Sequence, residues 1–179
     1  MNPPEWYTFF TLGVDYYIAG RYAVLAGLNP VAGNIIHHAI EMFLKGGLSK
    51  KGRSLDDLKN RFSHRLPRIW EAFKSEFKDQ SLAQFDNIVS SLHKFEDIRY
   101  PDRIVKDGMQ SIIGITKHKF TTTSRPEPMY ELYLQDIDSL VGQVFATAGA
   151  NPRAYLDGII KADAKKYLLE DNQVASLTG

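Results

Sequence analysis

The chain of 179 residues contains no cysteine, which excludes disulfide bonds, thiolate metal ligands and a cysteine nucleophile. No uncharged run reaches 20 residues, about the length that a membrane-spanning helix needs. The first five residues show neither the basic start nor the apolar block of a signal peptide. From these absences we expect a cytoplasmic protein without a membrane segment.

Motifs of the common enzyme classes are missing as well. The glycine-rich phosphate loop, Gly-x-x-x-x-Gly-Lys-Ser/Thr, and the nucleophile elbow of hydrolases do not occur in the sequence. The net charge is +1, from 22 basic and 21 acidic side chains, so the protein is not a globally basic binder of nucleic acid. The sequence therefore predicts no cofactor and no ordinary metabolic enzyme.

The charged residues are distributed unevenly along the chain. Residues 1–44 contain only four of them, so most of this span is expected to be buried. Residues 45–68 contain eight basic and two acidic side chains, a local excess of six positive charges. Clustered cations favour RNA or an acidic partner, but this segment lacks the glycine–aromatic pattern of a base-stacking platform. A solvated basic face is the alternative interpretation.

The segment 34–45 has the clearest helical pattern, and the other helices are predicted to pack against it. Its apolar residues recur at i, i+3, i+4, i+7 and i+8, which places them on one face of a helix: Ile36, Ala39, Ile40, Phe43 and Leu44. The break at Gly27-Leu28-Asn29-Pro30 predicts that this helix begins near Val31, Asn34 is a candidate for its N-cap, and Gly46-Gly47 is expected to end it. Glu41 and Lys45 stand one turn apart, in the order that favours an ion pair at the surface or half-buried.

Helical periodicity recurs along most of the chain, and prolines and glycines mark its interruptions. Helices are predicted over residues 5–26, 65–78, 80–98, 134–148 and 153–169. Isoleucines and threonines favour extended structure near 103–128, so an irregular or hairpin insert is expected there. The predicted fold is an all-α, up-and-down helical bundle of four to five core helices, built as a single domain over residues 1–179. Its core comprises residues 5–102 and 134–148, with the insert at 103–133 and a C-terminal helix at 153–169.

Three short motifs occur in an order that resembles one known family. Ala39-Ile40-Glu41, with Lys45 four residues after the glutamate, is similar to the second helix of that family. Ser63-His64-Arg65-Leu66 resembles the H-x-L segment ahead of its third helix, and Arg99-Tyr100-Pro101-Asp102 resembles the RYP ending of its fourth helix. The family is HEPN, small helical domains of which many are paired with minimal nucleotidyltransferases. The likeness covers roughly residues 8–102, with residues 134–148 as a fifth helix.

The resemblance implies a homodimer, a nucleotidyltransferase partner and a place in a toxin–antitoxin or defence system. Ribonucleases of the family carry an arginine followed four to six residues later by a histidine. These side chains meet in a dimer cleft and cut RNA without a metal. In this chain Arg99 would need a histidine at 104–106, where Ile104, Val105 and Lys106 stand. The predicted function is therefore a non-catalytic binding module that contacts a nucleotide, RNA or a partner protein.

Ligand contact is predicted for Arg99, Tyr100 and Asp102, because a guanidinium group matches phosphate oxygens in a bidentate way. The structural alternative is an arginine that pairs with Asp97 or Asp102 at the helix end. Two other functions stay open. One is a divergent metal-independent ribonuclease in which Arg99 acts with a histidine from elsewhere: His64, His93 or His118. The other is a structural dimeric bundle without a ligand.

His64, Glu41 and Lys45 are the remaining predicted site residues, with a role closer to that of a scaffold. His64 is expected to hydrogen-bond to the Glu41–Lys45 pair and so to hold the bundle together.

A metal site is the alternative interpretation of His37, His38 and Glu41, because His37 and Glu41 stand one helical turn apart. Such a site would need further ligands on other helices, for which His64 and His93 are available. Polar residues at the edge of a packed helix explain the same pattern, so no metal is predicted.

Overall fold

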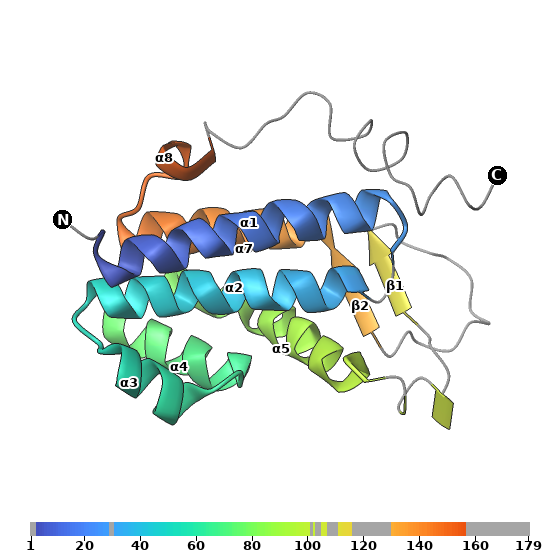
Figure 1. Ribbon diagram of the computed structural model, residues 1–179, viewed down its shortest axis with the longest axis horizontal. Helices are drawn as coiled ribbons and strands as arrows, with labels where there is room; N and C mark the ends of the chain where they lie inside the picture. Colours follow the sequence, from blue (N-terminus) through green and yellow to red (C-terminus); the bar gives the residue numbers. More distant parts are fainter. Residues whose placement is uncertain are drawn as a thin grey trace.

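The computed structural model describes residues 3–28, 31–100, 102, 105–106, 111–115 and 130–156. Within these residues helices predominate, and the only strands are the short pair β1 (Ser111–Gly114) and β2 (Tyr130–Tyr133). The helices form one packed bundle around a shared apolar core (Figure 1). Among the described helices, none is both long enough and apolar enough to cross a membrane. The prediction of an all-α bundle is confirmed.

Two long antiparallel helices, α1 (Glu5–Leu25) and α2 (Val31–Lys50), run side by side through the bundle (Figure 1). Glycines allow them to approach closely. A Cβ atom at Gly13 would lie 2.6 Å from ring carbons of Phe43, and one at Gly20 would lie 2.5 Å from Cγ1 of Ile36. Since packed carbon atoms do not come this near to one another, both positions require a residue without a side chain.

The start of α2 at Val31 agrees with the sequence-based prediction, whereas the predicted cap and stop residues of this helix are both wrong. The helix begins before Asn34, which is therefore a helical residue and not the N-cap. It also continues through Gly46-Gly47 to Lys50, so the prediction that these glycines end the helix is wrong. The reason is the packing of another helix against this part of α2. A Cβ atom at Gly47 would lie 2.5 Å from Cε2 of Phe73, so this glycine permits close packing and does not reverse the chain.

The helix α2 is the central element of the bundle, as the sequence predicts. It contacts α1, α4 (Leu66–Phe77), α5 (Asp86–Lys94) and α7 (Leu134–Ala148). Buried rings from three of these helices meet in the core. The ring centres of Phe10 on α1 and Phe43 on α2 each lie 5.0 Å from that of Phe145 on α7. The aromatic residues that the sequence places in several helices therefore form one core.

Short helical turns connect α2 to α4. The hydroxyl group of Ser54 accepts a hydrogen bond from the backbone N–H of Asp57 over 3.2 Å and caps α3 (Leu55–Asp57). A π-helical turn, η1 (Leu58–Phe62), follows directly. Pro67 lies in the first turn of α4, where its missing N–H leaves no hydrogen bond unmade.

The predicted helix over 80–98 consists of three consecutive pieces. A 3₁₀ helix, η2 (Gln80–Phe85), leads into α5, and a second one, η3 (Phe95–Ile98), follows it. The helix α7 has the predicted range 134–148 and ends in a left-handed residue, Gly149, with φ of 61°. The Lys50 ammonium group donates to the carbonyl oxygen of Ala148 over 3.0 Å, which ties the end of α2 to the end of α7.

The strands β1 and β2 pair in parallel, with Ser111 opposite Tyr130 and Gly114 opposite Tyr133. Extended structure in the predicted insert is thus present, but the two strands do not form the hairpin that was one of the two alternatives, because a hairpin is antiparallel. Residues 116–129 of the insert lie outside the described residues. The predicted C-terminal helix is described only over α8 (Arg153–Leu156).

Candidate functional site

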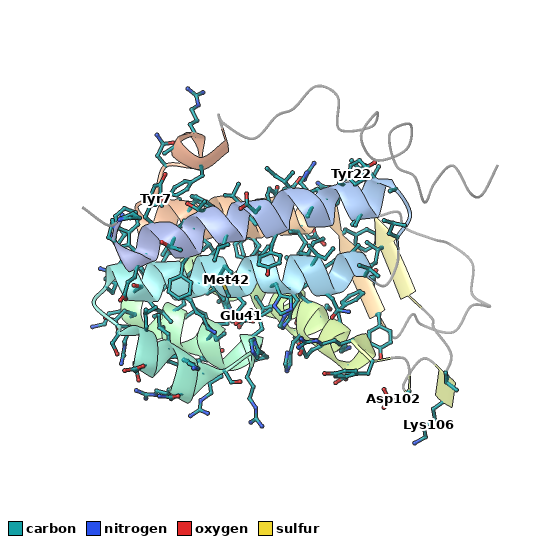
Figure 2. The ribbon with its side chains drawn as sticks, in the orientation of Figure 1. Tyr7, Tyr22, Glu41, Met42, Asp102 and Lys106 are labelled. Carbon is teal, nitrogen blue, oxygen red and sulfur yellow. The ribbon has the colours of Figure 1, made fainter. Side chains whose placement is uncertain are left out.

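A buried ion pair lies in the middle of α2. The Glu41 side chain is 0% exposed, and the Lys45 ammonium group lies 2.7 Å from its Oε1 atom. Glu41 lies on the side of α2 that faces α4 and α5 (Figure 2). The predicted pair is confirmed, although it is buried and not on the helix surface. Burying two charges is costly, so such a pair persists only where further hydrogen bonds satisfy both groups.

Lys45 also contacts the turn that follows η1. Its ammonium group donates to the carbonyl oxygen of Ser63 over 2.8 Å. Ser63 has φ of 49° and ψ of −128°, a conformation that residues other than glycine rarely adopt. Strained residues and π-helical turns both occur often at functional sites. The buried lysine therefore stabilises a backbone conformation that the local sequence disfavours.

The strained turn places His64 against Glu41. The Nδ1 atom of His64 lies 3.1 Å from both carboxylate oxygens, while 57% of the His64 side chain is exposed. A neutral imidazole donates from one ring nitrogen and accepts at the other, so donation from Nδ1 leaves Nε2 as the acceptor. The prediction that His64 hydrogen-bonds to the Glu41–Lys45 pair is confirmed.

Opposing effects act on the ionisation of Glu41. Burial by itself raises the pKa of Glu41, but the polar contacts of His38 and Lys45, the charge of Lys45 and the hydrogen bond from His64 together lower it to about 2. The Nδ1 atom of His38 lies 3.7 Å from Oε2 of the carboxylate. Because each of these groups favours the ionised form at close range, Glu41 is an anion at neutral pH.

A second group of polar side chains lies next to His38. His37 is fully buried, its ring stacks on that of His93 at a centroid distance of 5.9 Å, and its Nδ1 atom lies 3.7 Å from Oε2 of Glu96. The interpretation of His37 as a polar residue at the edge of a packed helix is therefore wrong. Four of the five histidines of the chain gather here. This histidine cluster comprises His37, His38, Glu41, His64, His93 and Glu96.

Two residues of this region are not among the predicted site residues, although Ser63 belongs to one of the family motifs. Glu96 has no spacing relation to α2 and reaches His37 only because η3 packs on α2. Ser63 gives no sign of its strained backbone, since serine is common in ordinary turns. No local signal in the sequence would have identified either residue.

The burial of His37 predicts a specific dependence of stability on pH. Burial lowers the pKa of His37 from 6.5 to about 4, against the smaller opposing effects of Glu96 and Glu41. Between these two values the unfolded chain binds a proton and the folded protein does not, so the free energy of unfolding decreases as the pH falls through this window. We expect this residue alone to cost about 2 kcal/mol of stability between about pH 7 and pH 5.

Urea unfolding in metal-free buffer at several pH values measures this loss. His37→Phe is the matched variant, because it keeps an aromatic ring against His93 and cannot titrate. The free energy of unfolding of His37→Phe should decrease less than that of the wild type across the window. An equal decrease in both proteins would show that His37 is not buried in its uncharged form.

An open pocket lies beside His64. Its volume is about 610 Å³, and its lining includes Phe9 of α1, Lys45, Lys59, Ser63 and His64. Residues of α3 and η1 complete the wall. The pocket therefore combines apolar surface with the exposed part of the carboxylate-bound histidine and with two lysines.

The residues predicted to contact a ligand do not lie together. Arg99, Tyr100 and Asp102 are exposed, and Figure 2 shows Asp102 well apart from Glu41. Arg99 donates to Oε1 of Glu96 over 3.2 Å, not to either of the aspartates considered for it, and its guanidinium carbon lies 6.0 Å from the centre of the Tyr100 ring. The six predicted residues thus form two groups, one beyond α5 and one around the middle of α2.

Comparisons of the chain with protein-family models, with curated proteins and with solved structures found no match. The candidate site is therefore defined by its own geometry. It combines a buried carboxylate, a histidine oriented by that carboxylate, and an open pocket in the most basic segment of the chain.

Proposed function

We propose that the protein is a HEPN-like, non-catalytic binding module whose ligand is a nucleotide or the phosphate backbone of RNA. The observation that carries this proposal is the position of His64. Its ring is hydrogen-bonded to Glu41 of the buried Glu41–Lys45 pair and lies beside an open pocket in the basic segment 45–68. The resemblance to the HEPN family supports the proposal from the sequence, because the same three residues carry two of the motifs.

Unpaired surface cations are the groups that a polyanion binds. Lys59, Arg61 and Arg65 are exposed, and none of them forms an ion pair with a carboxylate in the described part of the chain. Arg53, in the same segment, is instead neutralised by Asp57 at 3.3 Å. Contact between free cations and phosphates releases condensed counterions, which favours binding. The three unpaired cations are therefore the proposed phosphate contacts beside His64.

Removing these cations should weaken the binding of RNA and reduce its dependence on salt. We expect Lys59→Ala/Arg61→Ala/Arg65→Ala to lower the slope of log affinity against log salt concentration by about 2, since each phosphate contact on a single strand contributes about 0.7. Fluorescence anisotropy with labelled single-stranded RNA at several salt concentrations measures the slope.

A second triple variant, Lys94→Ala/Lys106→Ala/Arg153→Ala, provides the control. It removes the same charge from exposed positions outside the basic segment, so the slope should stay close to that of the wild type. Equal effects of the two triple variants would mean that binding follows net charge and that the proposed surface does not exist. Arg99→Ala, measured alongside, tests the separate prediction that Arg99 contacts phosphate.

A divergent metal-independent ribonuclease is the second candidate function, and one observation favours it. Metal-free cleavage needs a proton acceptor near the attacking 2′-hydroxyl group, and His64 is an exposed histidine oriented by a carboxylate. Arg99, which corresponds to the arginine of the family motif, donates a hydrogen bond to Glu96, and among the residues that the structure describes none joins it to His64.

One experiment tests for cleavage and for binding. Chelator-treated protein is incubated with labelled RNA, and the same mixture is run in a gel-shift assay.

The three outcomes of that incubation separate the candidate functions. Cleavage that His64→Gln abolishes would establish the ribonuclease. Intact RNA with a gel shift would support the binding module. Intact RNA without a gel shift would favour the third candidate, a structural dimeric bundle that has no ligand.

On the family resemblance we also propose a homodimer, with a minimal nucleotidyltransferase as a further partner in a toxin–antitoxin or defence system. The helix α1 offers a surface for self-association. Against the expectation that most of residues 1–44 is buried, α1 exposes Tyr7, Leu12, Tyr16 and Tyr22, and Figure 2 shows Tyr7 and Tyr22 near its two ends. Aromatic residues are enriched at protein interfaces.

Sedimentation velocity measures the state of association. We expect twice the chain mass of 20.3 kDa for the wild type and the mass of one chain for Tyr16→Glu. A wild-type monomer would exclude the dimer.

A further inference from the structure

Several polar atoms of the histidine cluster are buried without a hydrogen-bond partner among the described residues. They are Nδ1 and Nε2 of His37, Nδ1 of His93 and Oε2 of Glu96. Native proteins leave few such atoms unsatisfied, because each lost hydrogen bond is costly. His37 has neither ring nitrogen paired, and an imidazole in its neutral form carries a lone pair on one of them. That nitrogen is available to a ligand.

Three potential metal ligands converge at this point. One ligand atom each from His37, His38 and Glu41 lies within 4.8 Å of the other two. Around a tetrahedral zinc ion with bonds of about 2.0–2.1 Å, ligand atoms are separated by about 3.4 Å. The Nδ1 atom of His38 and Oε2 of Glu41, at 3.7 Å, are already close to that separation. Only modest side-chain movement would be needed to bring the third ligand into place.

Glu41 keeps one oxygen for such an ion. Lys45 bonds to Oε1, whereas Oε2 is the oxygen that faces His38. His64 also lies 3.1 Å from Oε2 and is largely exposed, so it can exchange its hydrogen bond for a bond to the ion. The charge of Lys45 repels a cation, so the histidine ligands have to contribute much of the affinity.

We propose that His37, His38 and Glu41 bind a divalent transition-metal ion of the Zn²⁺ class, with His64 as an exchangeable fourth ligand. Imidazole nitrogens and a carboxylate are a ligand set that suits Zn²⁺, and three residues leave one coordination position open. The bound ion links α2 to the turn after η1, at the wall of the pocket. This proposal departs from the sequence-based prediction, in which no metal is bound. Metal binding at this site does not depend on the proposed RNA or nucleotide ligand.

Co²⁺ is the probe for this site, because tetrahedral Co²⁺ gives visible ligand-field absorption that reports its coordination. The full-length protein is stripped with a chelator, titrated with Co²⁺ and then with Zn²⁺. We expect absorption bands that saturate at one ion per chain and disappear when Zn²⁺ displaces Co²⁺. We also expect Zn²⁺ to raise the melting temperature, since a ligand of the folded state stabilises it.

Variants locate the ion. His38→Ala and Glu41→Gln should each weaken Co²⁺ binding at least about tenfold, an effect that loss of even an outer partner of a metal ligand can have. Glu71→Gln makes the same chemical change at an exposed position of α4 and should bind as the wild type does. Circular dichroism without metal checks the fold of each variant. His64→Ala, at an exposed side chain, should keep the fold and lower the intensity of the bands.

Two results would overturn the proposal. One is the absence of ligand-field bands with the wild-type protein, which would mean that ordered water or a proton satisfies His37. The other is undiminished Co²⁺ binding by folded His38→Ala. Because the cleavage and gel-shift assays use chelator-treated protein, neither result changes their outcome.

Discussion

Glu41→Ala is expected to lower the free energy of unfolding by about 3–5 kcal/mol, the cost of leaving one buried charge of an ion pair without its partner. The substitution would leave the Lys45 ammonium group buried and would remove the acceptor that orients His64. Since proteins of this size are stable by only about 5–15 kcal/mol, this is a large part of the total. Urea unfolding followed by circular dichroism near neutral pH measures the change.

Two further variants separate the burial of charge from a simple loss of packing. Glu41→Gln/Lys45→Met removes both charges and should recover part of the lost stability, because no buried charge is left unpaired. Arg53→Ala breaks a partly exposed pair with Asp57 and should cost less than about 1 kcal/mol. If Glu41→Ala costs no more than Arg53→Ala, the buried pair does not govern the stability of α2.

Gly33→Ala is expected to destabilise the protein by about 3 kcal/mol through overpacking. A Cβ atom at Gly33 would lie 2.0 Å from Cδ1 and 2.5 Å from Cε1 of Phe95. Phe95 is fully buried at the start of η3, so neither its ring nor α2 can move without disturbing the core. A displacement of η3 would also shift Glu96 relative to His37, so the histidine cluster would be disturbed as well.

Gly142→Ala is the matched control, because it makes the same change inside another helix. An added Cβ atom at Gly142 of α7 would have no atom within 4 Å. Alanine is favoured over glycine in a helix, so we expect a gain in stability of up to about 1 kcal/mol. Thermal unfolding of both variants should therefore give changes of opposite sign. A Gly33→Ala protein as stable as the wild type would show that Phe95 adjusts without cost.

The helices could be predicted because their signals are local. Apolar spacing and helix breakers act within a few residues, and the predicted ranges 5–26, 65–78 and 134–148 agree closely with α1, α4 and α7. The end of α2 could not be predicted in this way. Whether a glycine ends a helix or allows close packing depends on what lies opposite. For Gly46-Gly47 that is a pair of aromatic rings, those of Phe10 and Phe73.

Part of the candidate site followed from the sequence as well. The one-turn spacing of Glu41 and Lys45 predicts their ion pair, and the predicted bond from His64 to that pair is present. Their burial did not follow, because it depends on the helices that cover α2. The role of Arg99 as a ligand contact stays a prediction, and its bond to Glu96 requires the turn of η3.

By itself, therefore, the sequence determined the helical class of the fold, the central place of α2 and the ion pair within it. The tertiary structure alone decided that His37 is buried, that Glu96 approaches it, and that Ser63 is strained beside a pocket. The physical reason is the range of the interactions. Hydrogen bonds and apolar spacing along one helix connect neighbours in the chain, whereas burial and the convergence of charges depend on segments brought together only when the bundle packs.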